Sequence, residues 1–169
     1  TPVDMRDGGT ITAWSSSNPM QKTSVTYERI DSVPAIVSFV SSQELSDGSK
    51  ADNLLDGNPN TIWHSVYSVT VANYPHTVEF DYTDTLPIKG FTWLPRQNGA
   101  NGDIKDYKIA VSTDGQTWTE VMTGAFENSK SRKTVIFSAP VTARFVRLTA
   151  LSSQNGADFA SGAEFGIIK

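Results

Sequence analysis

Short runs in which hydrophobic and polar residues alternate recur along most of the chain. In the run HTVEFDY the hydrophobic residues Val78, Phe80 and Tyr82 stand at every second position. The acidic residues Glu79 and Asp81 stand between them. A period of two buries one face of a strand and leaves the other in water. Similar strand-forming runs are AIVSFV (35–40), IKGFTWL (88–94), DYKIAVS (106–112), TWTEVM (117–122), KTVIFS (133–138), ARFVRLTAL (143–151) and AEFGII (163–168).

Turn-forming residues separate these runs. The dipeptide Asp114-Gly115 stands between two of them, and Asp-Gly is typical of tight hairpin turns because such turns require positive φ angles. No long window shows the 3.6-residue period of an amphipathic helix. We therefore predict an all-β fold, an antiparallel β-sandwich.

The first part of the chain is patterned differently. Residues 1–33 are rich in Ser and Thr and contain only two strand-like pieces, ITAW and SVTYERI. We interpret them as a linker or the edge of a preceding module, and we interpret residues 34–169 as one domain with a complete core. Because the sequence opens with Thr-Pro, we expect it to be part of a longer chain, with any export signal upstream.

Charge and composition exclude several functions. A net charge of -4 and an isoelectric point near 5.1 disfavour nucleic acid and anionic membranes as partners. The absence of cysteine excludes disulfides and thiolate metal sites. The sequence contains no GxSxG, HExxH or phosphate-binding glycine motif, and neither His64 nor His76 has a nucleophile signature nearby. We do not expect the chain to be an enzyme.

One polar loop attracts attention because it ends in aromatic residues. The stretch LLDGNPNTIWHS (54–65) is rich in turn-forming residues, which are followed directly by Ile-Trp-His. Such a loop is usually only a connection, but its carboxylate, amide and hydroxyl oxygens are also what a calcium ion requires. The loop alone leaves both interpretations open.

A family resemblance bears on this choice. The segments KADNLLDGNPNTIWHS, VEFDY, IKGFTWLPRQ, DYKIAVSTDGQTWTEV, ARFVRLTAL and FASGAEFGI occur in this order. Together they resemble the discoidin domain, also called the coagulation factor V and VIII C-type domain, and most closely carbohydrate-binding module family 32. The resemblance covers about residues 34–169. It implies a jelly-roll β-sandwich of about eight strands.

The resemblance implies a structural calcium ion held by the polar loop and the last strand. Side-chain oxygens would come from Asp56, Thr61 and Glu164, and Thr61 would add its carbonyl. Further backbone carbonyls would come from Ala51, Asn58 and Ala163. In this arrangement a residue of the C-terminal strand closes the calcium cage.

The same resemblance implies a site for galactose or N-acetylgalactosamine. The family's binding positions are occupied here by His64, Arg96, Asn101 and Phe159. The imidazole and the guanidinium would hydrogen-bond the axial hydroxyl and its neighbour, the amide would add a donor and an acceptor, and the phenyl ring would stack on the C–H face. Each residue taken singly also has an ordinary structural explanation. We expect His64 and Arg96 in solvent-facing loops.

The four tryptophans receive different interpretations. Trp63 and Trp93 stand in apolar strand contexts, so we assign both to the core. We assign Trp118 to the core as well, although an exposed Trp118 would offer a second platform for a sugar. Trp14 cannot be assigned from its context.

The resemblance implies an accessory module that would hold a secreted or surface glycoside hydrolase, such as a hexosaminidase, against galactoside or hexosamine-containing glycans. We expect it to be monomeric within a multidomain chain and to lie outside the cell, at the cell surface or in the periplasm. The alternative is an adhesion domain that binds protein or phospholipid, as animal discoidin domains do. Those animal domains carry a disulfide, and the absence of cysteine and the negative charge here disfavour phospholipid.

Overall fold

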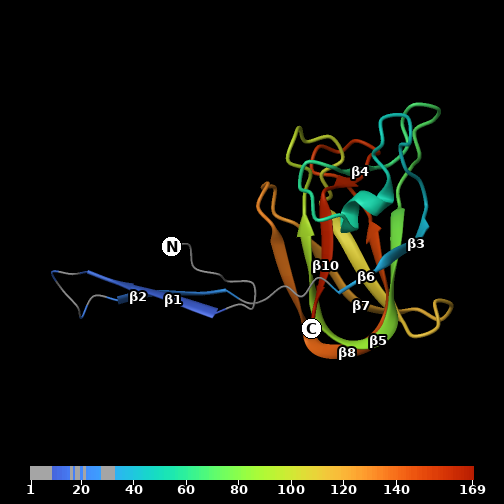
Figure 1. Cartoon of the computed structure of the whole chain (residues 1–169). Coiled ribbons are helices and arrows are strands. Elements are labelled where there is room, and N and C mark those ends of the chain that lie inside the picture. The colour runs from blue at the N-terminus through green and yellow to red at the C-terminus, as the bar shows by residue number, and fades with distance from the viewer. Residues whose placement is uncertain (1–8, 16, 18–19, 21, 28–32) are drawn as a thin grey trace. The chain divides into compact units, whose positions relative to one another are not determined.

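The computed structural model describes residues 9–15, 17, 20, 22–27 and 33–169. The chain divides into two units, Thr1–Asp31 and Ser32–Lys169. In the first unit β1 (Gly9–Trp14) and β2 (Lys22–Tyr27) pair antiparallel (Figure 1), and the hydroxyls of Thr12 and Ser24 hydrogen-bond across them at 2.8 Å. Both predicted strand-like pieces fall on this hairpin, but residues 28–30 of SVTYERI lie outside the described residues.

The second unit is an antiparallel β-sandwich of eight strands, as predicted. Its strands are β3 (Ile36–Val40), β4 (Trp63–His64), β5 (His76–Leu94), β6 (Asp106–Ser112), β7 (Thr119–Ala125), β8 (Lys133–Ala150), β9 (Ser161–Gly162) and β10 (Glu164–Ile168). A short 3₁₀ helix, η1 (Ala51–Leu55), precedes β4. The main sheet has the order β10-β5-β8-β6-β7, with β3 also paired to β5, and β4 pairs with β9. No helix in the described ranges is long and apolar enough to cross a membrane.

Two long strands build both layers of the sandwich. β5 pairs with β3 over its first half and with β10 over its second half, while β8 follows β5 along both halves. Figure 1 shows β5 and β8 curving together at the end opposite η1 and β4. One layer therefore has five strands: β3, β6 and β7 with the first half of β5 and the second half of β8. The other contains β10 with the second half of β5 and the first half of β8.

The strand boundaries correct part of the sequence analysis. The runs 76–82 and 88–94 are one strand, and so are 133–138 and 143–151 up to Ala150. The chain bends within β5 at Thr83, a non-glycine residue with φ 63°, whose amide donates to Asp81 at 2.8 Å. Register shifts let the pairing continue past the bend, so a sequence break at residues 83–87 does not end the strand.

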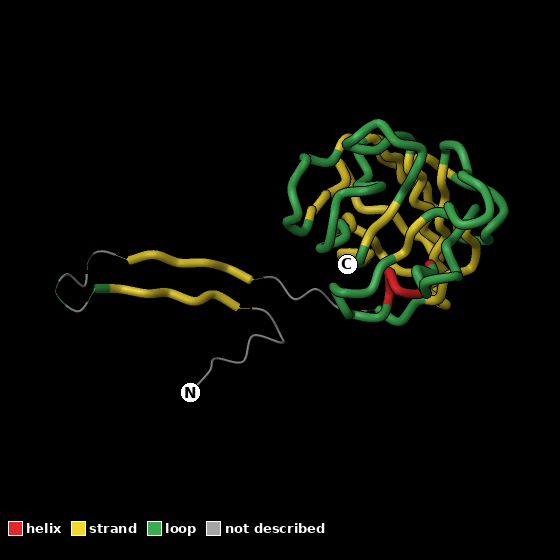
Figure 2. The backbone as a smooth tube through the Cα atoms, turned by 90° about the horizontal axis from the view of Figure 1, so that it is seen from above, coloured by secondary structure: helices red, strands yellow, loops and turns green. Residues whose placement is uncertain are grey.

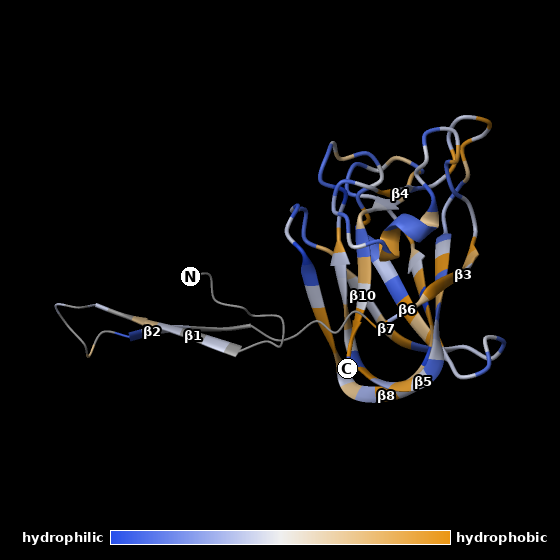
Figure 3. Ribbon diagram, in the orientation of Figure 1, coloured by the Kyte–Doolittle hydropathy of each residue, from blue (hydrophilic) through white to orange (hydrophobic). Residues whose placement is uncertain are grey.

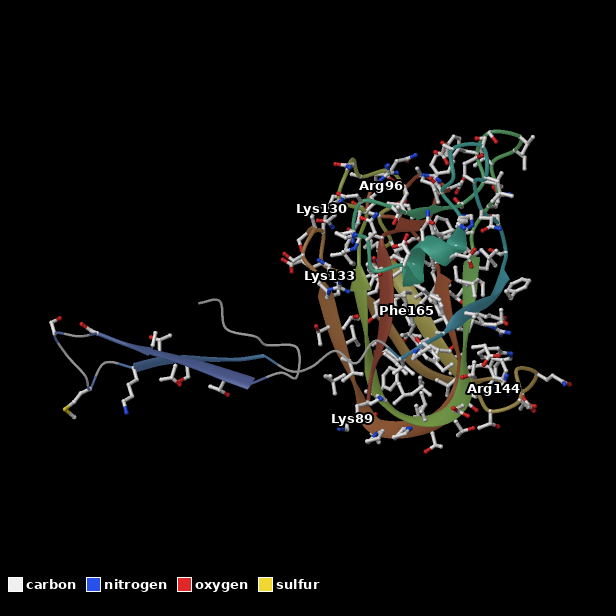
Figure 4. The ribbon with its side chains drawn as sticks, in the orientation of Figure 1. Lys89, Arg96, Lys130, Lys133, Arg144 and Phe165 are labelled. Atoms are coloured by element: carbon white, nitrogen blue, oxygen red, sulfur yellow. The ribbon has the colours of Figure 1, made fainter. Side chains whose placement is uncertain are left out.

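Hydrophobic residues of the two layers meet face to face in the core. Phe80 of one layer stacks on Phe165 of the other, with ring centroids 4.2 Å apart and an interplanar angle of 1°. Figure 3 shows hydrophobic and hydrophilic residues alternating along the strands, and Figure 4 shows Phe165 between the layers. Trp63 and Trp93 are buried, which confirms their assignment to the core. Trp118 is only half buried, so its assignment to the core was wrong.

The turn at Asp114-Gly115 differs from the predicted tight hairpin. Six residues, 113–118, connect β6 to β7, and within them only Gly115 has a positive φ, 74°. Asp114 acts through its carboxylate instead, because Oδ1 accepts from the amides of Gln116 and Thr117 at 2.8 Å each. The aspartate therefore caps a wider loop.

Candidate functional site

The predicted sugar-binding residues come from loops and short strands at one end of the sandwich. Figure 2 looks onto the sandwich from above, and loops cover this end. Figure 4 shows Arg96 and Lys130 among them. These loops are joined by the two-residue strands β4 and β9, which the sequence pattern did not reveal because two residues carry no periodicity.

The pairing of β4 with β9 brings His64 to Phe159. His64 stands opposite Ser161, and the amide of the next residue, Ser65, donates to the carbonyl of Ala160 at 2.8 Å. The imidazole and the phenyl ring consequently lie 5.4 Å apart between centroids. Two residues far apart in the sequence thus share one wall of the site.

The hydrogen bond of His64 fixes which nitrogen can accept. Nδ1 lies 2.7 Å from the carbonyl oxygen of Ser65. A carbonyl can only accept, so Nδ1 carries the proton and Nε2 presents a lone pair. Nε2 has no hydrogen-bond partner among the described residues. The imidazole therefore offers a sugar hydroxyl one acceptor in a fixed orientation.

The environment of His64 keeps the imidazole neutral. The residue is only 2% exposed, so the expectation that it faces solvent was wrong: the β4–β9 pairing and two aromatic neighbours cover it. This burial lowers the pKa of His64, the Ser65 carbonyl opposes the shift, and the positive charge of Arg96 adds to it. The effect of Arg96 also means that the two side chains are close enough to interact.

Arg96 is oriented by backbone carbonyls and not by a carboxylate. Its Nε donates to the carbonyl of Asn98 at 2.6 Å, and Nη1 donates to that of Asn101 at 3.3 Å. It forms no ion pair with any acidic side chain in the described part of the chain, so the ordinary explanation for an arginine beside a strand does not apply. Nη2 keeps its hydrogens for another acceptor.

Buried Ser161 holds the Arg96 loop against β9. Its hydroxyl donates to the carbonyl of Asn101 at 2.7 Å, and its amide donates to the carbonyl of Gly102 at 2.7 Å. The side chain of Asn101 itself is exposed and has no hydrogen bond within the described residues. His64, Arg96 and Asn101 are therefore connected through Ser161, which the sequence analysis missed.

Tyr67 is a second residue that the sequence analysis missed. Its ring lies edge-on to His64, 5.0 Å away between centroids, and 6.5 Å from Phe159. Its hydroxyl donates to Asp47 at 2.7 Å, and its amide donates to buried Glu44 at 2.9 Å. These partners lie 20 and 23 positions earlier in the sequence. The only local signal was a tyrosine three positions after His64.

The predicted metal residues form an oxygen-rich cluster. The hydroxyl of Thr61 lies 2.7 Å from Asp56 Oδ2 and 2.8 Å from the carbonyl oxygen of Asn58. The amide of Asn58 donates to Asp56 Oδ1 at 2.8 Å. The single proton of the Thr61 hydroxyl serves two acceptors, so the cluster has more acceptors than donors. A cation would suit this imbalance.

Glu164 adds a buried carboxylate to this cluster. Burial raises the pKa of Glu164, the charge of Asp56 raises it further, and Arg132 and the amide of Gly57 oppose the shift. Oε1 of Glu164 is buried without a hydrogen-bond partner. An orphaned buried carboxylate oxygen beside a second carboxylate fits a divalent cation well.

The remaining predicted metal residues lie in elements that touch the cluster. Ala51 begins η1 and is buried, and η1 contacts β10, the strand that begins at Glu164. Ala163 is also buried, and its amide donates to the carbonyl of Leu94 at 2.8 Å. No group of three or more His, Asp or Glu side chains suited to a metal occurs within the described ranges, so a cation here would depend on carbonyl and hydroxyl oxygens as well.

Comparison with known proteins identifies the family of this chain. The sequence profile of the F5/8 type C domain matches residues 38–165. The chain belongs to this family. A sialidase from Micromonospora viridifaciens is 36% identical in an alignment of 170 positions that covers 99% of this chain and 26% of the sialidase. The chain therefore spans about a quarter of that relative.

Two solved structures from Clostridium perfringens share the fold of this F5/8 type C domain. CpGH89CBM32-5, solved with GalNAc-β-1,3-galactose, has a TM-score of 0.75 and 30% identity and covers 83% of this chain and 99% of that chain. The family 32 carbohydrate-binding module of NanJ, solved with galactose, has a TM-score of 0.71 and 29% identity and covers 82% of this chain and 96% of that chain. The resemblance to family 32 seen in the sequence is thus confirmed.

Proposed function

We propose that this F5/8 type C domain is a non-catalytic carbohydrate-binding module for galactose, N-acetylgalactosamine or a related hexosamine. The observation that carries the proposal is the convergence at one rim of a neutral acceptor imidazole, a guanidinium without a carboxylate partner and two aromatic rings. Galactose-type sugars present an axial hydroxyl on one side and an apolar C–H face on the other, and such a rim matches both.

Each side chain has a distinct task in this proposal. His64 Nε2 accepts a hydrogen bond from the axial hydroxyl, and Arg96 Nη2 donates to the same or the adjacent oxygen. Asn101 donates to and accepts from a further hydroxyl. The rings of Phe159 and Tyr67 contact the C–H face and the edge of the sugar, where burial contributes without requiring a fixed orientation.

A calcium ion has a structural part in this proposal. Asp56, Thr61 and Glu164 would bind it through side chains, and the carbonyls of Ala51, Asn58 and Ala163 would complete the shell. The ion would neutralise the two carboxylates and join the 56–61 loop to the start of β10. Since His64 follows the loop by three residues and Phe159 precedes β10 by five, the ion would stiffen both sides of the sugar site.

The module would act by tethering a larger protein to its substrate. A single shallow sugar site gives weak binding, with dissociation constants of about 0.1–10 mM. Weak binding is sufficient when the module is linked to a glycoside hydrolase, because the link raises the local concentration of glycan at the enzyme. We place this activity outside the cytoplasm, where such glycans are found.

An exposed apolar rim favours docking of a protein surface as a second candidate function. Val69 is 88% exposed and Leu45 is 65% exposed, and Val71 lies in the same loop as Val69. Figure 3 shows hydrophobic residues at the tip of the loop that follows β4. Glu44 accepts from the amide of Ser68, so Leu45 and Val69 belong to loops that are bound together. Exposed apolar side chains that gather at one rim suit a partner protein.

A glycan array in buffer with millimolar calcium tests the main proposal. We expect retention on glycans that end in galactose or N-acetylgalactosamine, and loss of this retention in the Arg96→Ala variant. The proposal would be contradicted if no galactoside is bound at any density on the array while the chain is retained on phosphatidylserine vesicles or on the linked catalytic domain. That result would favour an adhesion function.

A further inference from the structure

We propose that the outer face of the five-stranded layer is a second binding site, which takes an extended neutral oligosaccharide. This face carries an open groove of about 650 Å³, a volume within the range of small-molecule sites. It is lined by residues of β3, β5, β6, β7 and β8 and of the segments that flank them. None of these residues takes part in the sugar site or the metal cluster described above.

The strand registers build the floor of the groove as one line of side chains. Phe39 pairs with Glu79, Glu79 with Arg147, Arg147 with Ala110, and Ala110 with Glu120. The line therefore crosses five strands. Four strand spacings of about 4.8 Å give a length of about 19 Å, which suits an extended chain better than a single sugar ring.

Aromatic side chains border the groove at two of its sides. Phe39 on β3 is 49% exposed, and Trp118, just before β7, is half buried. The guanidinium of Arg147 lies 3.8 Å from the ring centroid of Trp118 and holds the indole in place. Ala110, between Arg147 and Glu120, leaves the floor low at the position next to β7. Flat aromatic borders around a hollow are suited to the C–H faces of sugar rings.

The floor is polar and carries no net charge. Arg147 donates to Glu79 with N···O distances of 2.9 Å from Nε and 2.7 Å from Nη2, and Lys108 lies 3.6 Å from Glu120. The hydroxyls of Thr77 and Thr149 lie 3.4 Å apart in the neighbouring row. Both cations are matched by carboxylates, so an anionic ligand gains little attraction here.

Chemistry of this kind selects a neutral polyhydroxylated chain. Sugar hydroxyls both donate and accept, so they can bond the carboxylates, the guanidinium and the threonine hydroxyls at once. An apolar protein surface would have to strip water from both ion pairs without replacing their hydrogen bonds, which is costly. A peptide strand would seek the open edge of a sheet, and this groove lies on its face.

Oligosaccharide binding can be tested with the sugar site disabled. The double variant His64→Ala, Arg96→Ala of the full chain is run in affinity gels that contain galactan, galactomannan, xyloglucan or mixed-linkage β-glucan. We expect at least one of these neutral polysaccharides to retard the double variant. Its tetrasaccharide should then shift the NMR signals of the Trp118 indole and the Thr149 amide. Because the loop site is absent from this variant, the result is independent of the function proposed above.

Two substitutions on the double-variant background locate the binding. Trp118→Ala removes an aromatic border, and Ala110→Gln fills the floor without removing any contact. Each should lower the affinity at least tenfold. Ile136→Ala, an exposed hydrophobic residue on the part of β8 that belongs to the other layer, should leave it unchanged. Absence of retardation by all four polysaccharides, shifts confined to other surfaces, or unchanged affinity in Ala110→Gln would each overturn the proposal.

Discussion

The phenol of Tyr67 donates a hydrogen bond of 2.7 Å to Asp47, and this bond fixes the ring that stands edge-on to His64. The same bond is the largest cause that raises the pKa of Tyr67 and lowers that of Asp47. Glu44 reinforces the arrangement by accepting from the amides of Tyr67 and Ser68. Three polar contacts thus place one aromatic wall of the proposed sugar site.

Two substitutions of Tyr67 should distinguish the contribution of its ring to binding from that of its hydroxyl. Tyr67→Ala removes the wall, and we expect the affinity for a galactoside to fall about tenfold, since an aromatic contact contributes about 0.5–1.5 kcal/mol beyond burial. Tyr67→Phe keeps the ring and loses only the bond to Asp47, so a fall of about two- to threefold is expected. Titration calorimetry measures both. Leu45→Ala is the matched control in the adjoining loop, and equal affinities of the Tyr67→Ala variant and the wild-type protein would remove Tyr67 from the site.

Substitution of either polar group, His64 or Arg96, should weaken galactoside binding. His64→Ala should reduce galactoside binding at least tenfold, because it removes the only fixed acceptor proposed for the axial hydroxyl and leaves that hydroxyl unpaired at about 1–3 kcal/mol. Arg96→Lys retains the charge but loses the planar arrangement of donors, and a similar loss is expected. Thermal melting should confirm that both variants fold. Full affinity in the Arg96→Lys variant would mean that only the charge is used.

The affinity for galactosides should fall in mild acid. The folded protein holds the pKa of His64 below its ordinary value of 6.5, mainly by burial, so the imidazole is neutral at pH 7 and Nε2 accepts. Protonation turns this nitrogen into a donor beside Arg96. Affinity should therefore be constant from pH 8 to 7 and decline as the pH falls below 6.5 through the lowered pKa. The same titration in the Tyr67→Phe variant should keep this profile; an affinity that rises as the pH falls would contradict the role of Nε2.

The free energy of unfolding should also decrease in mild acid. His76 is also buried, and burial lowers its pKa. As the pH falls, His64 and His76 are protonated in the unfolded chain before they are protonated in the folded protein. The free energy of unfolding therefore decreases as the pH falls below 6.5. Denaturant melts at pH 7.5 and 5.5 measure this change. A His76→Gln variant should reduce the pH dependence, and an unaltered slope would assign it to other groups.

Alternation of residues was sufficient to predict the fold, but contacts distant in sequence decided the details of the site. Runs such as 106–112 became strands because each buries one face, whereas the bend at Thr83 and the pairing across it depend on β8, which lies more than fifty residues later. His64 was singled out by resemblance, yet its burial results from pairing with β9. Tyr67 could not be identified because its orientation depends on Asp47 and Glu44. The half-exposed position of Trp118 depends on Arg147, which its local sequence does not reveal.

Removal of divalent cations should lower the melting temperature without unfolding the domain. A ligand at a hundred times its dissociation constant adds about 2.7 kcal/mol, which for a domain of this size corresponds to a shift of about 5–10 °C. Glu164→Gln should abolish the difference between calcium and chelator, because it removes the charge of the buried carboxylate. Asp52→Asn, an exposed carboxylate on η1, is the matched control and should keep the full shift. Superimposable melting curves of the wild-type chain in calcium and in chelator would contradict the proposed ion.

Gly162 should not accept a side chain without a large loss of stability. A Cβ at this position would lie 2.0 Å from Cη2 of Trp93, an indole that is fully buried and stacks on Phe126. The indole cannot move without disturbing the core, so Gly162→Ala should lower the free energy of unfolding by about 3 kcal/mol. Gly166→Ala is the matched control in the next strand: its Cβ would meet only the Thr92 hydroxyl, at 3.2 Å, and a cost below about 1 kcal/mol is expected. Urea denaturation measures both values, and equal costs would mean that Trp93 has room to shift.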